Sequence, residues 1–407
     1  MASSPRRDEI LGTAARLFES SGIRTSLTDI ADACGILPGS LYSHFASKEA
    51  IVVELVARYQ TDLDETAEMA VADPPADPIA AIITLGTAIA ECSVRHRAAL
   101  LLTYYEPPSV FSTELADRAR RTPEKIVSAM HVLLDAAMAR GLLRPGVDLK
   151  VFADRIAKSM LHVGFGVYHR LRGAQQVPAI KCRMLLEGIA TAAPSDASLD
   201  TSPAHDAADH VIAQWRQLDA AADRLAAITS AARAEFSRRG YSATTIRDVA
   251  TAAGMRPGNL YRDIESKEHL LEMVLTDYAR SVDQGWTAVL DSRSSPLEKI
   301  DALCWININA VSTFREEHRI QSASLLYVPP VSKDLGLSFP AQLARLSDLL
   351  DEARRAGQVV VPGRTRDLRA RCTYSLIWVP DNIVDWLGPA ETLRFSRETF
   401  LRGATSS

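Results

Sequence analysis

The sequence of 407 residues predicts an all-α protein made of two copies of one helical unit. Three observations predict this fold class. A pattern of some forty residues near the N-terminus recurs in the second half of the chain. The apolar residues within each copy follow the spacing of amphipathic helices rather than the alternation of strands. Each copy is followed by a long stretch that again divides into helical segments, so the whole unit is duplicated.

The repeated pattern keeps a nearly constant offset along the chain. The run from Ile10 to Gly22 recurs from Ile228 to Gly240, an offset of 218 positions (228 − 10). One residue is inserted before Asp248, and the offset is then 219 (268 − 49). Such regularity does not arise by chance and indicates an internal repeat. The other matching elements are Asp29–Ala31 with Asp248–Ala250, Pro38–Tyr42 with Pro257–Tyr261, and Ser47–Glu49 with Ser266–Glu268.

The first copy begins with two predicted helices. The first ends at Gly22, because glycine readily takes a positive φ. Thr25 or Ser26 caps the second helix with a side-chain oxygen, and Gly35 ends it. The apolar stripes expected to be buried are Ile10, Ala14, Leu17 and Phe18 in the first helix and Leu27, Ile30, Ala31 and Cys34 in the second.

A short third helix is predicted from Pro38 to Phe45, since the first turn of a helix tolerates a residue without an N–H. Leu41 and Phe45 lie four positions apart and are expected to pack inward. Ser47 then caps a fourth helix, with Lys48 in its first turn. The third helix leaves an outward face made of Ser40, Tyr42, Ser43 and His44.

A helix pair joined by a glycine turn, whose second helix is short and polar on its outer face, is typical of a helix-turn-helix that reads the DNA major groove. The alternative is a three-helix bundle whose polar residues are merely solvated. Both copies keep an outward tyrosine, Tyr42 and Tyr261, which packing alone does not require. The pattern therefore favours DNA binding.

These motifs resemble the DNA-binding region of TetR/AcrR-family transcriptional regulators, over roughly residues 7–55 and 223–275. The resemblance implies a DNA-binding head and a helical effector-binding body in each half. Family members normally act as homodimers on a near-palindromic operator, and repression that an effector relieves is the default. Because both heads stand in one chain here, the expected arrangement is an intrachain pseudo-dimer.

The chain is long enough for several domains, and five segments are expected. By analogy with the family, the last helices of each body, within 148–192 and 368–402, would pack together. The segments are head 1 (1–50), body 1 for effector binding and dimerisation (51–192), a linker with an extra helix (193–222), head 2 (223–270) and body 2 (271–407).

Within the connecting segment, Ala193–Ala204 is small, polar and broken by proline, which predicts a flexible linker. Asp206–Ala221 then predicts a helix with Val211, Trp215 and Leu218 on one stripe. The first copy has no counterpart of this helix. It is either a spacer that carries the chain to the second head or a surface helix with a packed tryptophan.

The family resemblance places DNA contacts at matched positions of the two heads. Asn259 can form a paired hydrogen bond with adenine, which Ser40 cannot, and Arg256 adds a charge where head 1 has Leu37. Different half-sites, and hence an asymmetric operator, are therefore expected. The implied contacts are Thr28, Pro38, Gly39, Ser40, Tyr42, His44 and Lys48 in head 1, and Arg247, Arg256, Pro257, Gly258, Asn259, Tyr261, Arg262 and Lys267 in head 2.

One departure from the family pattern is Asp263-Ile264, where head 1 has His44-Phe45. A carboxylate facing phosphate weakens DNA binding. Three readings remain open: head 2 binds more weakly, Asp263 turns toward a basic neighbour such as Arg262, or head 2 is a degenerate scaffold.

The resemblance also implies a small-molecule effector in a helical pocket, in one half or both. Aromatic residues at helical spacing are more often plain core, whereas Asn307 and Asn309 in an apolar helix are better indicators, because buried amides need partners. Two stretches, around His162 and Trp378, faintly resemble the family branch that answers to acyl-CoA thioesters. The candidate lining residues are Tyr104, Tyr105, Phe111, Met160, His162, Phe165 and Tyr168 in half one, and Trp305, Asn307, Asn309, Tyr327, Tyr374, Trp378 and Asn382 in half two.

Composition narrows the function classes. The net charge of −4 and pI near 6.2 argue against nonspecific binding of polyanions, so any DNA affinity must come from local patches. Five scattered cysteines without a Cys-x-x-Cys pair fit a reducing cytoplasm and argue against a disulfide framework or a zinc site. Neither a signal peptide nor a membrane span is predicted, since the apolar run 79–90 is short.

We find no nucleophile elbow, zinc-protease motif or phosphate-binding glycine loop, so neither an enzyme nor a cofactor or metal is expected. The predicted function is a cytoplasmic, sequence-specific repressor whose partners are double-stranded operator DNA and a hydrophobic effector such as an acyl-CoA. The rival is a regulator that acts through protein contacts with a degenerate second head. The operator, the effector, activation versus repression, and further homodimerisation stay open.

Overall fold

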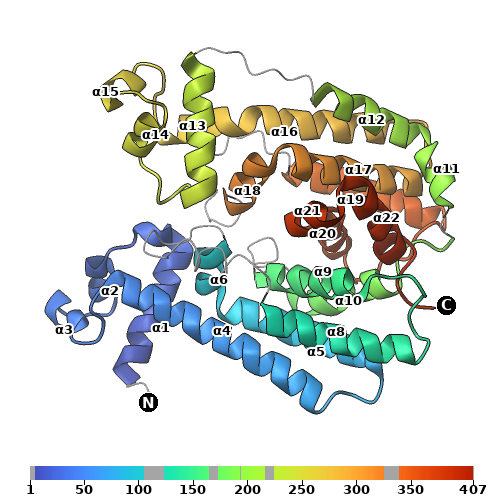
Figure 1. The fold of residues 1–407 in the computed structure, drawn as a ribbon, viewed down its shortest axis with the longest axis horizontal. Coiled ribbons are helices and arrows are strands. Elements are labelled where there is room, and N and C mark those ends of the chain that lie inside the picture. The colour runs from blue at the N-terminus through green and yellow to red at the C-terminus, as the bar shows by residue number, and fades with distance from the viewer. Residues whose placement is uncertain are drawn as a thin grey trace.

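The computed structural model describes residues 5–104, 123–164, 173–192, 194–215, 224–324 and 339–406. These residues form helices throughout and no strand, only two isolated β-bridges, as the sequence predicts. Two similar halves lie one above the other in Figure 1, with both N-terminal heads at one end and the C-terminus at the other.

The helices of the first half follow the predicted order. Head 1 is formed by α1–α3, and α4 leads from it into the body (Figure 1). The described helices are α1 (Pro5–Ser21), η1 (Gly22–Arg24), α2 (Leu27–Ala33), α3 (Pro38–Tyr42), α4 (Lys48–Ala72), α5 (Pro78–Arg95), α6 (Arg97–Tyr104), α8 (Glu124–Ala139), α9 (Leu149–Leu161), η2 (His162–Gly164), η4 (Ala174–Gln176) and α10 (Val177–Leu186).

The second half repeats this order after two connecting helices. Head 2 is formed by α13–α15, and α16 has the same length as α4. The described helices are α11 (Asp196–Asp200), α12 (Pro203–Trp215), α13 (Arg224–Arg239), α14 (Ile246–Ala252), α15 (Pro257–Leu260), α16 (Lys267–Asp291), α17 (Pro296–Thr313), α18 (Arg315–Ser324), α19 (Phe339–Arg355), α20 (Arg366–Ile377), α21 (Asp381–Leu387), α22 (Pro389–Ser396) and η5 (Arg397–Leu401).

The two bodies exchange backbone hydrogen bonds in a reciprocal way. In one direction Arg144 N–H donates to the carbonyl of Ala404 at 2.8 Å, and in the other Val360 N–H donates to Ile189 at 2.8 Å. The two β-bridges, Leu143 with Thr405 and Ala190 with Val359, are likewise equivalent. Each half thus pairs the segment after its α8 or α19 with the end of the other half. This reciprocity is the signature of a pseudo-twofold axis and supports the intrachain pseudo-dimer.

Two glycines lie at the centre of this exchange. Gly188 (φ +74°) and Gly403 (φ +80°) follow the last helix of each half and have left-handed backbones. A Cβ on either one would lie closer than 3.0 Å to backbone atoms of the other segment. The two chain segments therefore approach each other more closely than any residue with a side chain would allow.

Polar contacts reinforce the interface between α9 of one body and α20–α21 of the other. The buried Arg155 donates from Nη2 to the carbonyl of Leu376 at 2.8 Å. Lys158 Nζ lies 3.2 Å from the carboxylate of Asp381 and 2.7 Å from Oδ1 of Asn382. Because buried polar groups need partners in defined directions, these contacts fix the register of the two bodies.

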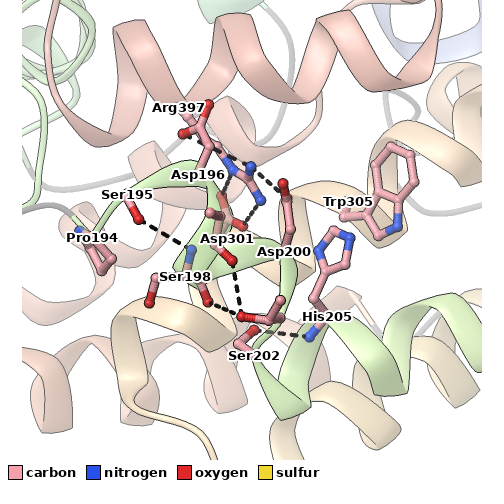
Figure 2. A network of polar contacts seen from close by, with 12 residues as sticks. Pro194, Ser195, Asp196, Ser198, Asp200, Ser202, His205, Asp301, Trp305 and Arg397 are labelled. Atoms are coloured by element: carbon pink, nitrogen blue, oxygen red, sulfur yellow. Dashed lines mark hydrogen bonds and ion pairs between the residues drawn. The ribbon is translucent and has the colours of Figure 1, made fainter.

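The predicted linker Ala193–Ala204 is corrected by the structure, because its described residues 194–204 contain α11 and the start of α12. A network of polar contacts holds α11 against body 2 (Figure 2). At its centre Arg397, 4% exposed, forms a bidentate pair with Asp301 at 2.9 and 2.8 Å. The same guanidinium reaches Asp200 at 2.7 Å, and Arg402 pairs with Asp196. Asp196 and Asp200, which the sequence places in a linker, thus form charge-assisted hydrogen bonds with Arg402 and with the buried Arg397.

The extra helix α12 also packs against the fold. Trp215 is 4% exposed and meets the ring of Phe314 edge-on, with centroids 5.4 Å apart. His205 stacks on Trp305, whose Nε1 donates to Asp209 at 2.7 Å. The packing of Trp215 fits the reading as a surface helix, while the spacer reading stays open because the rest of the predicted helix, with Leu218, lies outside the described residues. The helix α12 lies along α16 and α17.

Two further details differ from the prediction. Within the predicted helical stretch 368–402 the chain is interrupted between α20, which ends at Ile377, and α21, which begins at Asp381, because Pro380 lacks the N–H that a continuous helix needs. By length and composition alone α5 could cross a membrane, although half of that window is buried inside the fold. Its apolar residues, such as Leu85 and Ile89, belong to the core.

We expect Gly188→Ala to lower the free energy of unfolding by about 3 kcal/mol, because a left-handed residue with a Cβ is disfavoured and the Cβ overlaps the facing backbone. Urea denaturation of the full chain measures this. Gly141→Ala is the matched control, since Gly141 has φ +69° but open space around its Cβ, and about 1–2 kcal/mol is expected there. Equal losses in the two variants would contradict the close approach.

Candidate nucleic-acid interface

The two heads lie at the same end of the molecule, on either side of the plane between the bodies (Figure 1). The short helices α3 and α15 stand at the outer edge of each head. Head 1 packs on its body through α1 and α6, and head 2 does so through α13 and α18. The arrangement therefore presents two equivalent short helices from one rigid chain.

The same capping box starts the second helix of each head. In head 1 the N–H of Asp29 donates to Ser26 Oγ at 3.1 Å, and Ser26 N–H donates to the Asp29 carboxylate at 2.8 Å. Thr245 and Asp248 form the same pair in head 2. The hydrogen bonds from Ser26 lower the pKa of Asp29. Of the two predicted caps Thr25 and Ser26, Ser26 is the one used.

The third helices have the predicted inward and outward faces. Leu41 and Phe45 are buried in head 1, as are Leu260 and Ile264 in head 2. The outward tyrosines are largely exposed, Tyr42 to 55% and Tyr261 to 59%. Large exposed aromatic side chains on a small helix are available for an external partner. The other predicted contacts that are exposed are Thr28, Pro38, Gly39, Ser40, Arg247, Arg256, Pro257, Gly258, Asn259 and Arg262, while His44 is half-buried.

Gly39 and Gly258 occupy the second position of α3 and α15. A Cβ at either position would meet nothing within 4 Å. Glycine inside a helix is destabilising by roughly 0.5–1 kcal/mol relative to alanine, and nothing within the protein requires it here. Glycine at both positions is what the close approach of another molecule to the backbone would require.

Asp263 is paired within head 2. Its carboxylate accepts from Arg224 Nε at 2.9 Å, and the same guanidinium donates to the carbonyl of Asn259 at 3.0 Å. Asp263 thus turns toward a basic neighbour, as one of the three readings has it, and that neighbour is Arg224 at the start of α13 rather than Arg262. Arg224 and Asp263 are 39 positions apart in the sequence, so local pattern could not predict that they pair. With its charge compensated, Asp263 opposes DNA less than an unpaired carboxylate would.

The two lysines expected to hold phosphate are engaged inside the heads. Lys48 Nζ donates to the carbonyl of Ile23 at 2.8 Å, and Lys267 Nζ donates to the carbonyl of Tyr241. Lys267 also lies over the ring of Tyr241, 4.3 Å from its centroid. Both lysines therefore tie the start of α4 or α16 to the preceding turn, which differs from a free phosphate contact.

Part of the predicted effector set lies outside the described residues. Met160 is buried on α9, beside Cys182. Burial lowers the pKa of His162 to about 3, so this imidazole is neutral at pH 7. The residues outside the described part of the chain are Tyr105, Phe111, Phe165, Tyr168 and Tyr327, together with the side chain of Tyr104.

Four effector candidates of half two make structural contacts instead. Asn307 accepts from Trp286 Nε1 at 2.9 Å and donates to the carbonyl of Ile377 at 3.3 Å. Asn309 donates to a carbonyl of its own helix. The indole N–H of Trp305 binds Asp209, and Asn382 joins Asp154 and Lys158 at the interface of the bodies. Their polar groups have internal partners, which argues against a direct effector contact.

Tyr374 and Trp378 do lie together, in an aromatic cluster with Tyr278. The small cavity between them holds about 10 Å³, roughly one water. Tyr374 donates to Gln342 at 3.1 Å. His318 stacks on Trp378 with centroids 5.0 Å apart, and burial lowers its pKa to about 4. As described, the aromatic groups pack on one another and leave no room for a larger molecule.

A larger groove lies between α19 and α20. Its volume is about 490 Å³, and both apolar and charged side chains line it. Among the charged ones, Arg366 pairs with Asp348, and Arg371 binds Asp367 at 2.9 Å. Sequence reasoning missed this groove because no motif marks it. Its apolar lining consists of Phe339, Pro340, Leu343, Ala344 and Ala370.

Comparison with known proteins supports the interpretation of the heads. Residues 10–55 and 228–274 both match the pattern of bacterial regulatory proteins of the tetR family. The HTH-type transcriptional repressor KstR2 of Mycobacterium tuberculosis (strain H37Rv) is 33% identical over 157 residues, which are 35% of this chain and 72% of the relative. KstR2 of Mycolicibacterium smegmatis is 39% identical over 84 residues, 21% of this chain and only 38% of that protein.

Solved structures of similar proteins align with under half of this chain. The ketosteroid transcriptional regulator KstR2 of Mycobacterium tuberculosis is 28% identical, with a TM-score of 0.36, over 44% of this chain and 91% of that one. AibR in complex with isovaleryl coenzyme A and operator DNA is 18% identical, with a TM-score of 0.34, over 45% of this chain and all of that one.

We expect Asn307→Ala to lower the free energy of unfolding by about 3 kcal/mol, because it leaves the Trp286 N–H and the Ile377 carbonyl buried without partners. Chemical denaturation followed by tryptophan fluorescence measures this. Asn309→Ala serves as the control and is expected to lose about 1 kcal/mol, since its amide bonds only within its own helix. If Asn307→Ala left the free energy of unfolding unchanged but weakened effector binding, Asn307 would be an effector-binding residue after all.

Proposed function

This chain belongs to the tetR family of bacterial regulatory proteins, and on that premise we propose that it is a transcriptional repressor that binds operator DNA as a single-chain pseudo-dimer and is released by a small-molecule effector. The observation that carries the proposal is the pair of equally capped heads at one end of a body joined by reciprocal backbone bonds. One polypeptide thus provides the two heads and the joined bodies that two separate subunits provide in a homodimer.

Each head contributes the same kind of contact to DNA. The start of α3 or α15 enters the major groove, where Gly39 or Gly258 lets the backbone approach closely. The exposed tyrosine, Tyr42 or Tyr261, reaches a phosphate. The second helix of each head lies across the backbone, where Thr28 and its counterpart Arg247 bind phosphate, and exposed Arg262 adds a positive charge in head 2.

The two half-sites differ because the base-reading positions differ. Asn259 reads adenine through a bidentate amide, whereas Ser40 makes a single hydrogen bond. Arg256 in head 2 supplies a cation where head 1 exposes Leu37. The preferred operator is therefore asymmetric, and the chain binds it in one orientation.

The effector we propose has an apolar segment and a polar or anionic head, as an acyl-CoA thioester does. The groove between α19 and α20 supports this class, since apolar side chains and paired arginines both line it. Movement of body helices reaches the heads through α6 on α1 and α18 on α13. An ion pair of 2.6 Å between Arg233 and Glu317 strengthens the second of these contacts. Effector binding thus changes the spacing of the heads and releases DNA.

We place this regulator in the cytoplasm, where it meets DNA, and assign it no catalytic role. A second candidate, a regulator with a degenerate head 2 that acts through protein contacts, rests on the net negative charge of the chain and on Asp263. The ion pair of that carboxylate with Arg224 weakens the second of these two arguments. The domain limits that belong to this proposal are those expected from the sequence, with heads at 1–50 and 223–270.

We expect both Tyr42→Ala and Tyr261→Ala to weaken operator binding about tenfold, because each removes one phosphate contact, worth about 1.5 kcal/mol for a hydrogen bond to a charged group. Fluorescence anisotropy on a fragment selected from random DNA gives the affinities, and light scattering gives the mass of the complex. One chain per asymmetric site is expected. A palindromic site with two chains, sensitive only to Tyr42→Ala, would show that head 2 is a scaffold.

We expect an acyl-CoA thioester to displace the chain from labelled operator, and Ala344→Trp to prevent this by filling the groove. Ala344 is exposed on the groove wall, so the indole does not disturb the core. Ser128→Trp, at the equivalent position of α8, is the matched control and should leave release unchanged. Release unaffected by Ala344→Trp, or abolished equally by both variants, would place the effector elsewhere.

A further inference from the structure

Three side chains of types that can bind a metal ion meet where α4 passes the end of α5 in body 1. They are Asp62 on α4, Cys92 on α5 and His96, the residue that ends α5. Their ligand atoms, a carboxylate oxygen, a thiol sulfur and an imidazole nitrogen, all lie within 4.8 Å of one another. Asp62 Oδ2 and His96 Nε2 are 2.7 Å apart. This cluster lies in the body and has no part in the DNA-binding faces.

The local backbone fixes two of the three groups on one helix face. Cys92 and His96 are four positions apart, and the N–H of His96 donates to the carbonyl of Cys92 at 3.0 Å. Side chains at this spacing lie one above the other on a helix. Asp62 comes from a different helix, thirty positions earlier (92 − 62), so no compact sequence motif announces the site. Cys92 is buried, while the carboxylate and the imidazole are partly open to solvent.

The equivalent positions of the second half carry no metal-binding side chains, so they show which residues packing alone requires there. The counterparts of Asp62, Cys92 and His96 are Ser281 on α16, Ala310 on α17 and Phe314 at the end of α17. Phe314 packs against Tyr278 with ring centroids 5.7 Å apart, as His96 packs against Tyr59 at 5.8 Å. A phenyl ring therefore meets the packing requirement, and all three ligand groups are confined to body 1.

We propose that Asp62, Cys92 and His96 form a binding site for a divalent transition-metal ion, with Zn²⁺ as the best fit. Zinc accepts sulfur, nitrogen and oxygen ligands together in tetrahedral sites, at about 2.3 Å to sulfur and about 2.0–2.2 Å to nitrogen and oxygen. The thiolate and imidazole disfavour Mg²⁺ and Ca²⁺, which prefer oxygen ligands. Three protein ligands leave the fourth position to water.

The ion replaces the hydrogen bond between Asp62 Oδ2 and His96 Nε2, and the neutral imidazole then carries its hydrogen on Nδ1. The two atoms separate slightly, and the Cys92 thiol loses its proton to water and becomes the third ligand as a thiolate. Arg95 binds the same Asp62 oxygen at 2.8 Å, but its side chain is 62% exposed and can turn to the second carboxylate oxygen or to water. In that position it holds the carboxylate in orientation from outside the site.

The position of the site links it to head 1 alone. Asp62 lies on α4, the helix that runs from head 1 into the body, and His96 immediately precedes α6, which packs on α1. A bound ion therefore clamps α4 to the junction of α5 and α6. Head 2 has no such clamp, since Ser281, Ala310 and Phe314 cannot hold a metal together. The ion adjusts the position of one head relative to the other.

The test is binding of Co²⁺, a spectroscopic substitute for zinc, to the full-length chain after treatment with chelator. A stoichiometry of one, visible ligand-field bands of a tetrahedral site and a thiolate-to-cobalt charge-transfer band are expected, and Zn²⁺ should displace the cobalt. Cys92→Ser should remove the charge-transfer band, and His96→Gln and Asp62→Asn should each weaken binding at least about tenfold. The test involves no DNA, so its outcome is independent of the proposed repressor function.

Two variants control for adventitious binding. Cys34→Ser removes a half-buried thiol of head 1, and His131→Gln removes the histidine of an exposed pair with Asp135. Both should bind cobalt like the wild type, and zinc should raise the melting temperature of the wild type but not of His96→Gln. Absence of the thiolate band in the wild type, or equal affinity in His96→Gln and the wild type, would overturn the proposal even if Cys92→Ser fails to fold.

Discussion

The close contact between Gly188 and Gly403 is the constraint on which the rest of the structure depends. These glycines let the ends of the two bodies cross within backbone distance, and the reciprocal hydrogen bonds of Arg144 and Val360 follow from that crossing. A pseudo-twofold axis in one chain then sets both heads at the same end of the molecule. In a homodimer this geometry depends on protein concentration, whereas here the connection through α11 and α12 makes it intramolecular.

Because both halves belong to one chain, their sequences can differ from each other. Symmetry is retained where backbone geometry needs it, in the capping boxes of Ser26 and Thr245 and in the paired glycines. It is absent at exposed positions of the heads, where head 1 has Ser40 and head 2 has Asn259. In a homodimer the two heads carry the same residue at every position, because both subunits have the same sequence. The single chain thus combines a symmetric scaffold with two different surfaces.

Local patterns were predicted well and long-range partners were not. The duplicated helices, the inward Leu41 and Phe45 and the outward Tyr42 follow from periodicity and capping over a few residues. The partners of two polar groups could not be predicted from local pattern: Asp263 pairs with Arg224, and Asn307 accepts a hydrogen bond from Trp286, each across a gap in the sequence. The prediction of a linker was wrong for a similar reason. In the sequence Asp196 and Asp200 look like solvated linker residues, but in the structure they form ion pairs with Arg402 and Arg397.

The sequence by itself determined the all-α class and the duplication, since each is encoded in spacing within one helix or one repeat. Only the tertiary structure decided which polar groups are already satisfied, that residues 194–204 of the connecting segment are folded, and that a groove lies between α19 and α20. The physical reason is that periodicity records which face of a helix is buried, but not what it is buried against. Partners that lie hundreds of positions apart, such as Lys158 and Asp381, meet only when the two bodies close on each other.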